Sequence, residues 1–131
     1  MNASIQWQEI AAVDLLHRPQ IQELRNLERD NGAGDPSITL ELLGILSSDL
    51  DAYAVQFEDA ISVGDYERAG KVAHAIKGAA QTGGLKRLEH LAHVLESEAR
   101  AGKNAFLIEA APGLIRIISD SIQAFESEIK A

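Results

Sequence analysis

The chain has 131 residues, of which 46% are hydrophobic and 24% charged, a composition typical of one globular domain. Its formal net charge of −8 argues against nucleic acid as a partner, because a phosphate backbone repels an acidic surface. The chain has no cysteine, so we expect no disulfide. It has no apolar run long enough to span a bilayer and no start typical of a signal peptide. We therefore expect no membrane partner and a cytoplasmic protein.

Hydrophobic residues recur with helical spacing along the whole chain, and no segment alternates convincingly as a strand would. The first helix of the main domain is predicted to begin at Pro19, because proline suits the first helical turn. Residues 31–34 are predicted to form a loop. Asp35 and Pro36 then begin a long helix, as N-cap and first helical residue, that we expect to end near Val63.

Asp65 is the predicted N-cap of a third helix, which spans about residues 66–81 and is broken by residues 82–84. A fourth helix covers about residues 85–101. The last helix keeps one hydrophobic register across Pro112, so we expect a single helix that is kinked or locally frayed there.

Short connections between long amphipathic helices favour antiparallel neighbours. We therefore predict an all-α fold, an antiparallel four-helix bundle with one or two additional N-terminal helices. Residues 1–18 are expected to form an N-terminal arm or short helix, and residues 19–131 the helical bundle domain.

The third predicted helix carries an outward-facing histidine. Successive residues of a helix are rotated by about 100°, so Val72 and Ile76 each fall about 160° from His74. His74 therefore points away from the core, while Lys77 and Gly78 share its face. Glycine costs about 1 kcal/mol relative to alanine inside a helix. Gly78 therefore indicates a position where an approaching partner needs clearance.

The surroundings of His74 are basic within an acidic chain. No Asp or Glu occurs between Arg68 and Leu88. A neutral imidazole nitrogen is a nucleophile at physiological pH, and a phosphoryl group on it would add about two negative charges. Lys77, one turn after His74, could donate hydrogen bonds to the phosphoryl oxygens. Further candidate contacts with a partner are Lys71, Gln81, Lys86 and Arg87.

The stretch reads His74-Ala-Ile-Lys77-Gly78-Ala-Ala-Gln-Thr-Gly83-Gly84 and is followed by a leucine-rich helix. It resembles the motif of the histidine-containing phosphotransfer (HPt) domains of bacterial multistep phosphorelays, and the resemblance covers about residues 19–130. One position departs from the family pattern, because Gly83 stands where an aliphatic residue is usual. That departure predicts weaker packing of the turn after the third helix.

The resemblance implies a function. His74 would accept a phosphoryl group at Nε2 from an aspartyl phosphate on a receiver domain and pass it to the aspartate of another response-regulator receiver. The implied partners are receiver domains and a hybrid sensor histidine kinase. Mg²⁺ and the catalytic apparatus would lie on the receiver. This chain would then be a phosphorylated intermediate without a cofactor and not an enzyme, and we expect a monomer.

Two other interpretations remain. The bundle could be a non-phosphorylated adaptor that binds receiver domains or other signalling proteins, with His74 incidental. It could also bind a metal. However, di-iron bundles need a glutamate three residues before a histidine, and none of the four histidines has one. His90 and His93 are spaced for one helix face, but the apolar stripe of their helix points elsewhere and they have glutamate neighbours. They are interpreted as surface residues, and no metal site is predicted.

Overall fold

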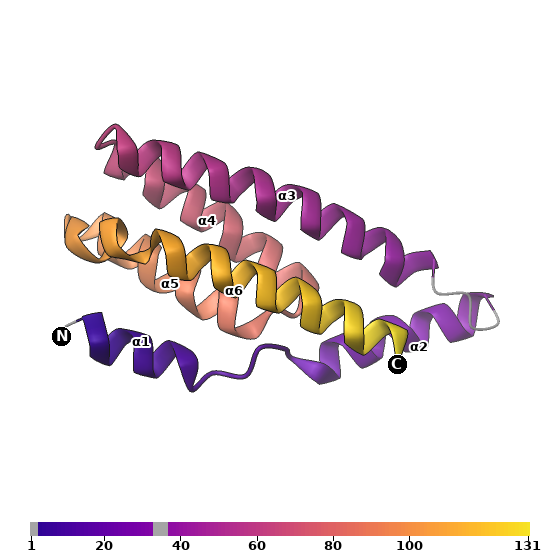
Figure 1. Ribbon diagram of the computed structural model, residues 1–131. Helices are drawn as coiled ribbons and strands as arrows, with labels where there is room; N and C mark the ends of the chain where they lie inside the picture. The colour runs from indigo at the N-terminus through magenta and orange to yellow at the C-terminus, as the bar shows by residue number, and fades with distance from the viewer. Residues whose placement is uncertain (1–2, 33–36) are drawn as a thin grey trace.

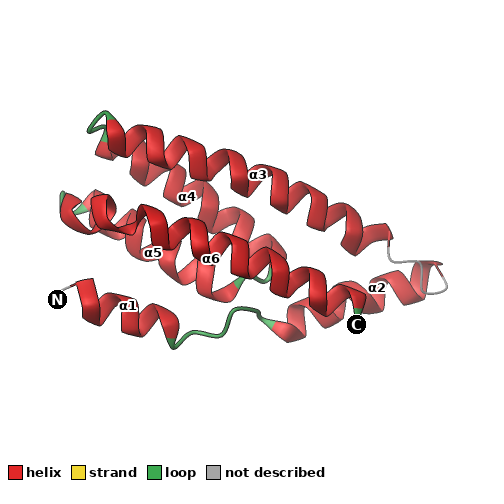
Figure 2. Ribbon diagram, in the orientation of Figure 1, coloured by secondary structure: helices red, strands yellow, loops and turns green. Residues whose placement is uncertain are grey.

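The computed structural model describes residues 3–32 and 37–131, and its regular elements are all helices (Figure 2). The helices are α1 (Ala3–Ala11), α2 (Arg18–Gly32), α3 (Ser37–Ser62), α4 (Tyr66–Gly83), α5 (Lys86–Arg100) and α6 (Asn104–Lys130) (Figure 1). The prediction of an all-α bundle with additional N-terminal helices is confirmed. None of the described helices combines the length and the apolarity that a membrane span requires.

Two expectations at the start of α3 have different outcomes. The predicted cap formed by Asp35 and Pro36 lies outside the described residues. The predicted loop at residues 31–34 is wrong for Asn31 and Gly32, because α2 includes both of them.

Helices α3 to α6 form the antiparallel bundle. In Figure 1, α3 and α5 run in one direction and α4 and α6 in the other. Helix α3 packs against α4 and α6, and α5 packs against the same two helices. The α4–α5 edge of the bundle therefore lies opposite the α3–α6 edge. The largest fully buried side chains of the bundle are Leu50, Phe57, Ile76, Leu85, Leu88, Leu91, Leu95, Leu107, Leu114 and Phe125.

The turn between α3 and α4 has the chemistry that its sequence predicts. Gly64 adopts a φ of +73°, a conformation that glycine tolerates without strain. The side chain of Asp65 accepts a hydrogen bond from the backbone N–H of Arg68 at 3.1 Å. This bond satisfies one of the unpaired N–H groups at the start of the helix, so α4 begins directly after Asp65.

The end of α4 corrects the prediction made for Gly83. The helix runs through Gly83, two residues beyond the expected end at residue 81, and Gly84 follows with a φ of +66°. Gly83 is buried, and a Cβ at this position would lie 2.6 Å from a methyl group of Leu46 on α3. The absent side chain therefore does not weaken the turn. It allows α4 to pack closely against a core leucine.

The N-terminal helix α1 packs on the outside of the bundle. The Trp7 ring lies 5.4 Å from the Phe106 ring, centroid to centroid. The same ring lies against Gly113 of α6, where any side chain would collide with it. Gln6 donates a hydrogen bond to Glu98 on α5 at 2.8 Å. Both apolar and polar contacts therefore attach α1 to α5 and α6.

The segment between α1 and α2 is bound to the turn between α4 and α5. The backbone N–H of His17 donates to the carbonyl of Gly84 at 2.8 Å. The side-chain amide of Gln20 donates to the carbonyls of Gln81 and Thr82 at 2.6 and 3.1 Å. These two carbonyls lie in the last turn of α4, where the helix itself supplies few backbone N–H partners. The N-terminal segment therefore supplies part of the C-terminal capping of α4.

Helix α6 is continuous from Asn104 to Lys130 and contains Pro112. Proline removes one backbone donor from a helix interior, but its neighbours can keep the register when an apolar face is buried. Leu107, Leu114 and Ile118 on either side of Pro112 are all buried. The expected single helix is therefore present.

Candidate functional site

Helix α4 has two chemically different faces. Val72, Ile76 and Ala80 are buried in the bundle, whereas the His74 side chain is 69% exposed. Apolar residues that recur at helical spacing direct one face of α4 to the core. His74, which lies between them in sequence, is directed outward by the same geometry, as the sequence predicts.

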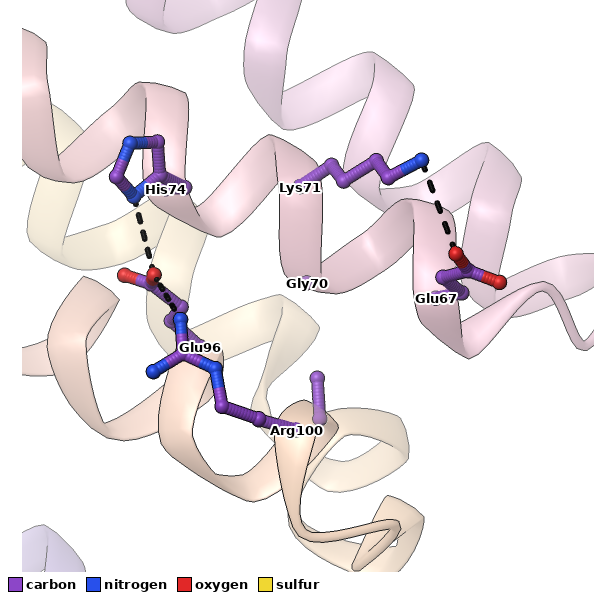
Figure 3. A pocket seen from close by; sticks show the side chains of 7 residues that line it. Glu67, Gly70, Lys71, His74, Glu96 and Arg100 are labelled. Carbon is purple, nitrogen blue, oxygen red and sulfur yellow. Dashed lines mark hydrogen bonds and ion pairs between the residues drawn. The ribbon is translucent and has the colours of Figure 1, made fainter.

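A buried glutamate of the neighbouring helix lies beside the histidine. Glu96 of α5 is only 11% exposed, and its Oε1 lies 3.0 Å from Nδ1 of His74 (Figure 3). The same oxygen accepts a hydrogen bond from Nη2 of Arg100 at 2.8 Å. The other oxygen, Oε2, forms an ion pair with Nζ of Lys77 at 2.7 Å. One carboxylate therefore joins three nitrogen-bearing side chains of α4 and α5.

Lys77 differs from its expected environment. An exposed lysine on the His74 face is predicted from the sequence, but the Lys77 side chain is only 21% exposed. Its ammonium group is bound to Glu96, which reaches it from α5. The expectation of an exposed Lys77 is wrong because a single helix does not reveal which residues its neighbour contributes.

The ion pair with Lys77 lowers the pKa of Glu96. The Lys77 contact is the largest influence, burial opposes it by disfavouring the charged carboxylate, and the contact with His74 lowers the pKa further. The net pKa lies below the ordinary value of 4.5, so Glu96 is ionised at neutral pH. The site therefore contains one carboxylate charge and two fixed positive charges, from Lys77 and Arg100.

This shift predicts a pH dependence of stability. A carboxyl group with a lowered pKa in the folded state stabilises the fold above its unfolded pKa, and this contribution is lost as the pH falls through the folded pKa. We expect the free energy of unfolding to decrease below about pH 4.5, and Glu96→Gln to remove part of that decrease. Urea denaturation of both proteins across the acidic range measures the difference. Equal pH dependence in the two proteins would contradict the assignment.

A hollow of about 410 Å³ lies beside the histidine, between α4 and α5. Glu67, Lys71 and His74 line it from α4, and Glu96 and Arg100 line it from α5 (Figure 3). Its position gives an approaching group access to the imidazole and to the Arg100 guanidinium from the same side.

Two glycines of α4 have different surroundings. A Cβ at Gly70 would lie 2.8 Å from the Cβ of Ala99, so Gly70 permits the close approach of α4 and α5. A Cβ at Gly78 would meet nothing within 4 Å. Nothing inside the bundle therefore requires a glycine at position 78, although helix propensity disfavours it.

The same substitution at these two positions should have opposite effects on stability. Gly78→Ala should raise the free energy of unfolding by about 0.5–1 kcal/mol, because alanine has the higher helix propensity. Gly70→Ala should lower it by roughly 1–2 kcal/mol, because overpacking at Ala99 outweighs that gain. Chemical denaturation of both variants provides the measurement. A destabilised Gly78→Ala would show that position 78 is required by the bundle itself.

The candidate partner contacts occupy different environments. Lys71 and Lys86 are exposed, and Nζ of Lys71 lies 3.8 Å from Oε1 of Glu67. The exposed side chain of Gln81 donates to Glu89 at 3.3 Å. Arg87 differs from these, because it is partly buried and its Nε donates to the carbonyl of Val13 at 2.7 Å. Arg87 therefore holds the N-terminal segment, and it is the least suited of the four to bind a partner.

His17, His90 and His93 do not line the hollow beside His74. His17 and His93 are exposed, and His90 is partly buried. Among residues 3–32 and 37–131, no group of three or more His, Cys, Asp or Glu side chains is arranged to hold a metal ion.

Sequence reasoning overlooked Glu96 and Arg100. The sequence does contain a weak indication of both. Glu96 lies between Leu95 and Ala99 in the apolar stripe of α5, and a carboxylate at the edge of a buried stripe needs a partner. Arg100, four residues later, is suitably spaced to supply one. The contact with His74 depends on the packing of two helices and is not encoded in either helix alone.

Comparison with protein families identifies the chain. The family model of the Hpt domain matches residues 41–128, which is about two-thirds of the sequence. Comparison with curated proteins and with solved structures gave no match. Hpt domains are phosphotransfer intermediates of phosphorelays, not enzymes in their own right, and they interact with receiver domains and kinases. Since the match includes α4, α5 and nearly all of α3 and α6, the chain belongs to the Hpt domain family.

Proposed function

We propose that His74 accepts a phosphoryl group from an aspartyl phosphate on one receiver domain and passes it to an aspartate on another. The observation that carries this proposal is the exposed imidazole of His74, whose Nδ1 lies 3.0 Å from the buried carboxylate of Glu96. The coarser function, phosphotransfer within a phosphorelay, is that of the family. The choice of His74 rests on the geometry of this site.

The contact with Glu96 favours one tautomer of His74. An ionised carboxylate accepts hydrogen bonds and cannot donate them, so Nδ1 must carry the hydrogen. The lone pair then lies on Nε2. When Nε2 attacks phosphorus, the P–O bond to the donor aspartate breaks, and the aspartate leaves as a carboxylate. The ring retains the Nδ1 hydrogen and becomes positively charged beside Glu96, so the step needs no proton transfer.

The reverse step uses the same groups. The carboxylate of the accepting aspartate attacks phosphorus, and the P–N bond breaks. Its electrons return to Nε2 as a lone pair, and the ring becomes neutral with its hydrogen still on Nδ1. Because Glu96 stabilises the charged ring in both directions, it acts as a positioning residue for transfer to and from His74.

Lys77 and Arg100 are proposed to stabilise the phosphoryl group. Lys77 forms an ion pair with Glu96, and Arg100 donates a hydrogen bond to it. An ammonium has three N–H donors and a guanidinium has five, so both side chains retain free donors. Charge-assisted hydrogen bonds to phosphoryl oxygens are among the stronger ones in proteins. Arg100, whose side chain is 77% exposed, can reach an incoming group with little rearrangement.

The surface around His74 is proposed to dock the receiver. Gly78 is open on its outer side, and Ala75 and Ala79 beside it are small and partly exposed. Small side chains allow another protein to bring its aspartate close to the imidazole. Lys71, Gln81 and Lys86 are candidates for contacts at the rim, and Mg²⁺ is expected on the receiver.

The proposal is tested with phosphorylated receivers as donors. Incubation with a cognate phosphorylated receiver should transfer label to this protein, and the label should be acid-labile and alkali-stable, as phosphohistidine is. Peptide mapping should place it on α4. An alkali-labile label would indicate an acyl phosphate. Receiver binding without any label would favour the adaptor interpretation.

The role of Lys77 has its own test. Lys77→Ala should slow phosphotransfer by roughly 10- to 150-fold, because loss of one charge-assisted hydrogen bond is worth roughly 1.5–3 kcal/mol. Rapid-quench measurement of transfer from the phosphorylated receiver determines the rate. Lys130→Ala is the control, because Lys130 lies on α6, outside the proposed site, with a side chain that is 58% exposed. An unchanged transfer rate in Lys77→Ala would contradict the proposed stabilisation of the phosphoryl group by Lys77. The ion pair with Glu96 would then be its remaining role.

A further inference from the structure

A second groove lies on the opposite side of the bundle from His74. It is formed between α3 and α6 and has a volume of about 270 Å³. Ala54 of α3 and Ile115 and Ile122 of α6 contribute its apolar lining, and Asp51 contributes a charge. Because the His74 hollow lies between α4 and α5, the two sites occupy opposite edges of the bundle.

Large apolar side chains are exposed along this edge. Ile115 of α6 is 42% exposed, and Ile108, seven residues earlier on the same helical stripe, is 52% exposed. Val55 of α3, one helical turn after the groove residue Asp51, is 67% exposed. Single exposed apolar residues are common, but a row of them beside a groove is typical of a surface that receives another helix.

The two helices that form this groove each carry a net negative charge. Helix α3 contains five acidic residues and no lysine or arginine, and α6 contains four acidic and two basic residues. Helix α4, on the other side, contains one glutamate against one arginine and two lysines. The exposed Asp51 and Glu58 lie seven residues apart on α3, so both are on the groove side of that helix. The groove therefore combines an apolar floor with an acidic rim.

We propose that the α3–α6 groove binds a cationic amphipathic helix of a partner protein. The apolar face of such a helix would cover Ile115 and Ile122, and its lysines or arginines would face Asp51 and Glu58. The charge makes a second copy of this chain a poor occupant, because two acidic faces repel each other. A helix bound here leaves the α4–α5 edge uncovered, so the protein can hold one partner while His74 engages another.

Binding of a synthetic helix of leucine and lysine, labelled with a fluorophore, tests the proposal on the full chain. Fluorescence anisotropy should show binding of this peptide and no binding of its leucine–glutamate counterpart. Asp51→Lys should weaken binding by about tenfold or more, because it replaces an attraction between opposite charges by a repulsion between like charges. The matched control is Asp120→Lys. It makes the same change in net charge at an exposed position of α6, roughly 140° around the helix from Ile115.

The outcomes distinguish this surface from the phosphotransfer site. Support requires that Asp120→Lys weaken binding less than about twofold and that NMR shift changes centre on α3 and α6. Equal weakening by both substitutions would reveal unspecific attraction to an acidic protein and overturn the proposal. Shift changes centred on α4 and α5 would overturn it as well. Failure here would leave the role of His74 intact, because transfer to His74 is measured separately.

Discussion

Replacing His74 by glutamine is expected to reduce acceptance of a phosphoryl group by at least about a thousandfold, because no other group at this position can form the P–N bond. The side chain is 69% exposed, so the free energy of unfolding should change by no more than about 0.5 kcal/mol. Transfer of labelled phosphate from a phosphorylated receiver measures the first effect, and chemical denaturation measures the second.

The matched control for this variant is His93→Gln, which changes an exposed histidine of α5 in the same way. His93→Gln should accept phosphate at the rate of the unchanged protein. If His74→Gln still accepted phosphate at a comparable rate, another residue would be the acceptor, and the role proposed for Glu96 would also fall.

The second large effect is expected at Glu96. A glutamine at this position keeps the size but presents an NH₂ group to either Lys77 or His74. If the NH₂ group faces Nδ1 of His74, Nδ1 must accept a hydrogen bond and the ring hydrogen moves to Nε2. We therefore expect Glu96→Gln to slow phosphotransfer by about tenfold or more, as wrong tautomers do elsewhere. Nitrogen NMR of the His74 ring should show an increased population with hydrogen on Nε2.

Glu96 also affects stability. Glu96→Ala should lower the free energy of unfolding by roughly 1–3 kcal/mol, because it leaves the partly buried ammonium of Lys77 without its counter-ion. This loss of stability is smaller than for a fully buried ion pair, because the partly exposed Lys77 can still be solvated by water. The control for the transfer rate of Glu96→Gln is Glu98→Gln on the same helix. Glu98 binds Gln6 of α1 and not His74. If Glu98→Gln slowed transfer as much as Glu96→Gln, loss of helix packing would explain both rates.

Local patterns were sufficient to predict the helices. Asp65 was identifiable as an N-cap because a carboxylate just before an amphipathic segment commonly caps a helix. Its side chain does accept a hydrogen bond from the backbone N–H of Arg68. The direction of His74 was identifiable because helical rotation separates it from Val72 and Ile76. Both properties depend on residues within one or two turns of each other.

Properties that depend on packing between helices were not identifiable. Glu96 is 22 residues from His74 in sequence, and only the pairing of α4 with α5 brings them together. Arg87 looked like a free cation, yet it binds Val13, which is 74 residues away. Gly83 was expected to weaken the packing of the turn, but Leu46 of α3 occupies the space that a side chain would need. In each case, the partner lies on an element whose position no local pattern specifies.

The contact of Trp7 with Phe106 and Gly113 has an experimental use. Trp7 is the only tryptophan of the chain, and it belongs to α1, outside the four bundle helices. Its fluorescence therefore reports the seating of α1, while circular dichroism reports the helices as a whole. Comparing the two during denaturation separates release of α1 from unfolding of the bundle, without any added label.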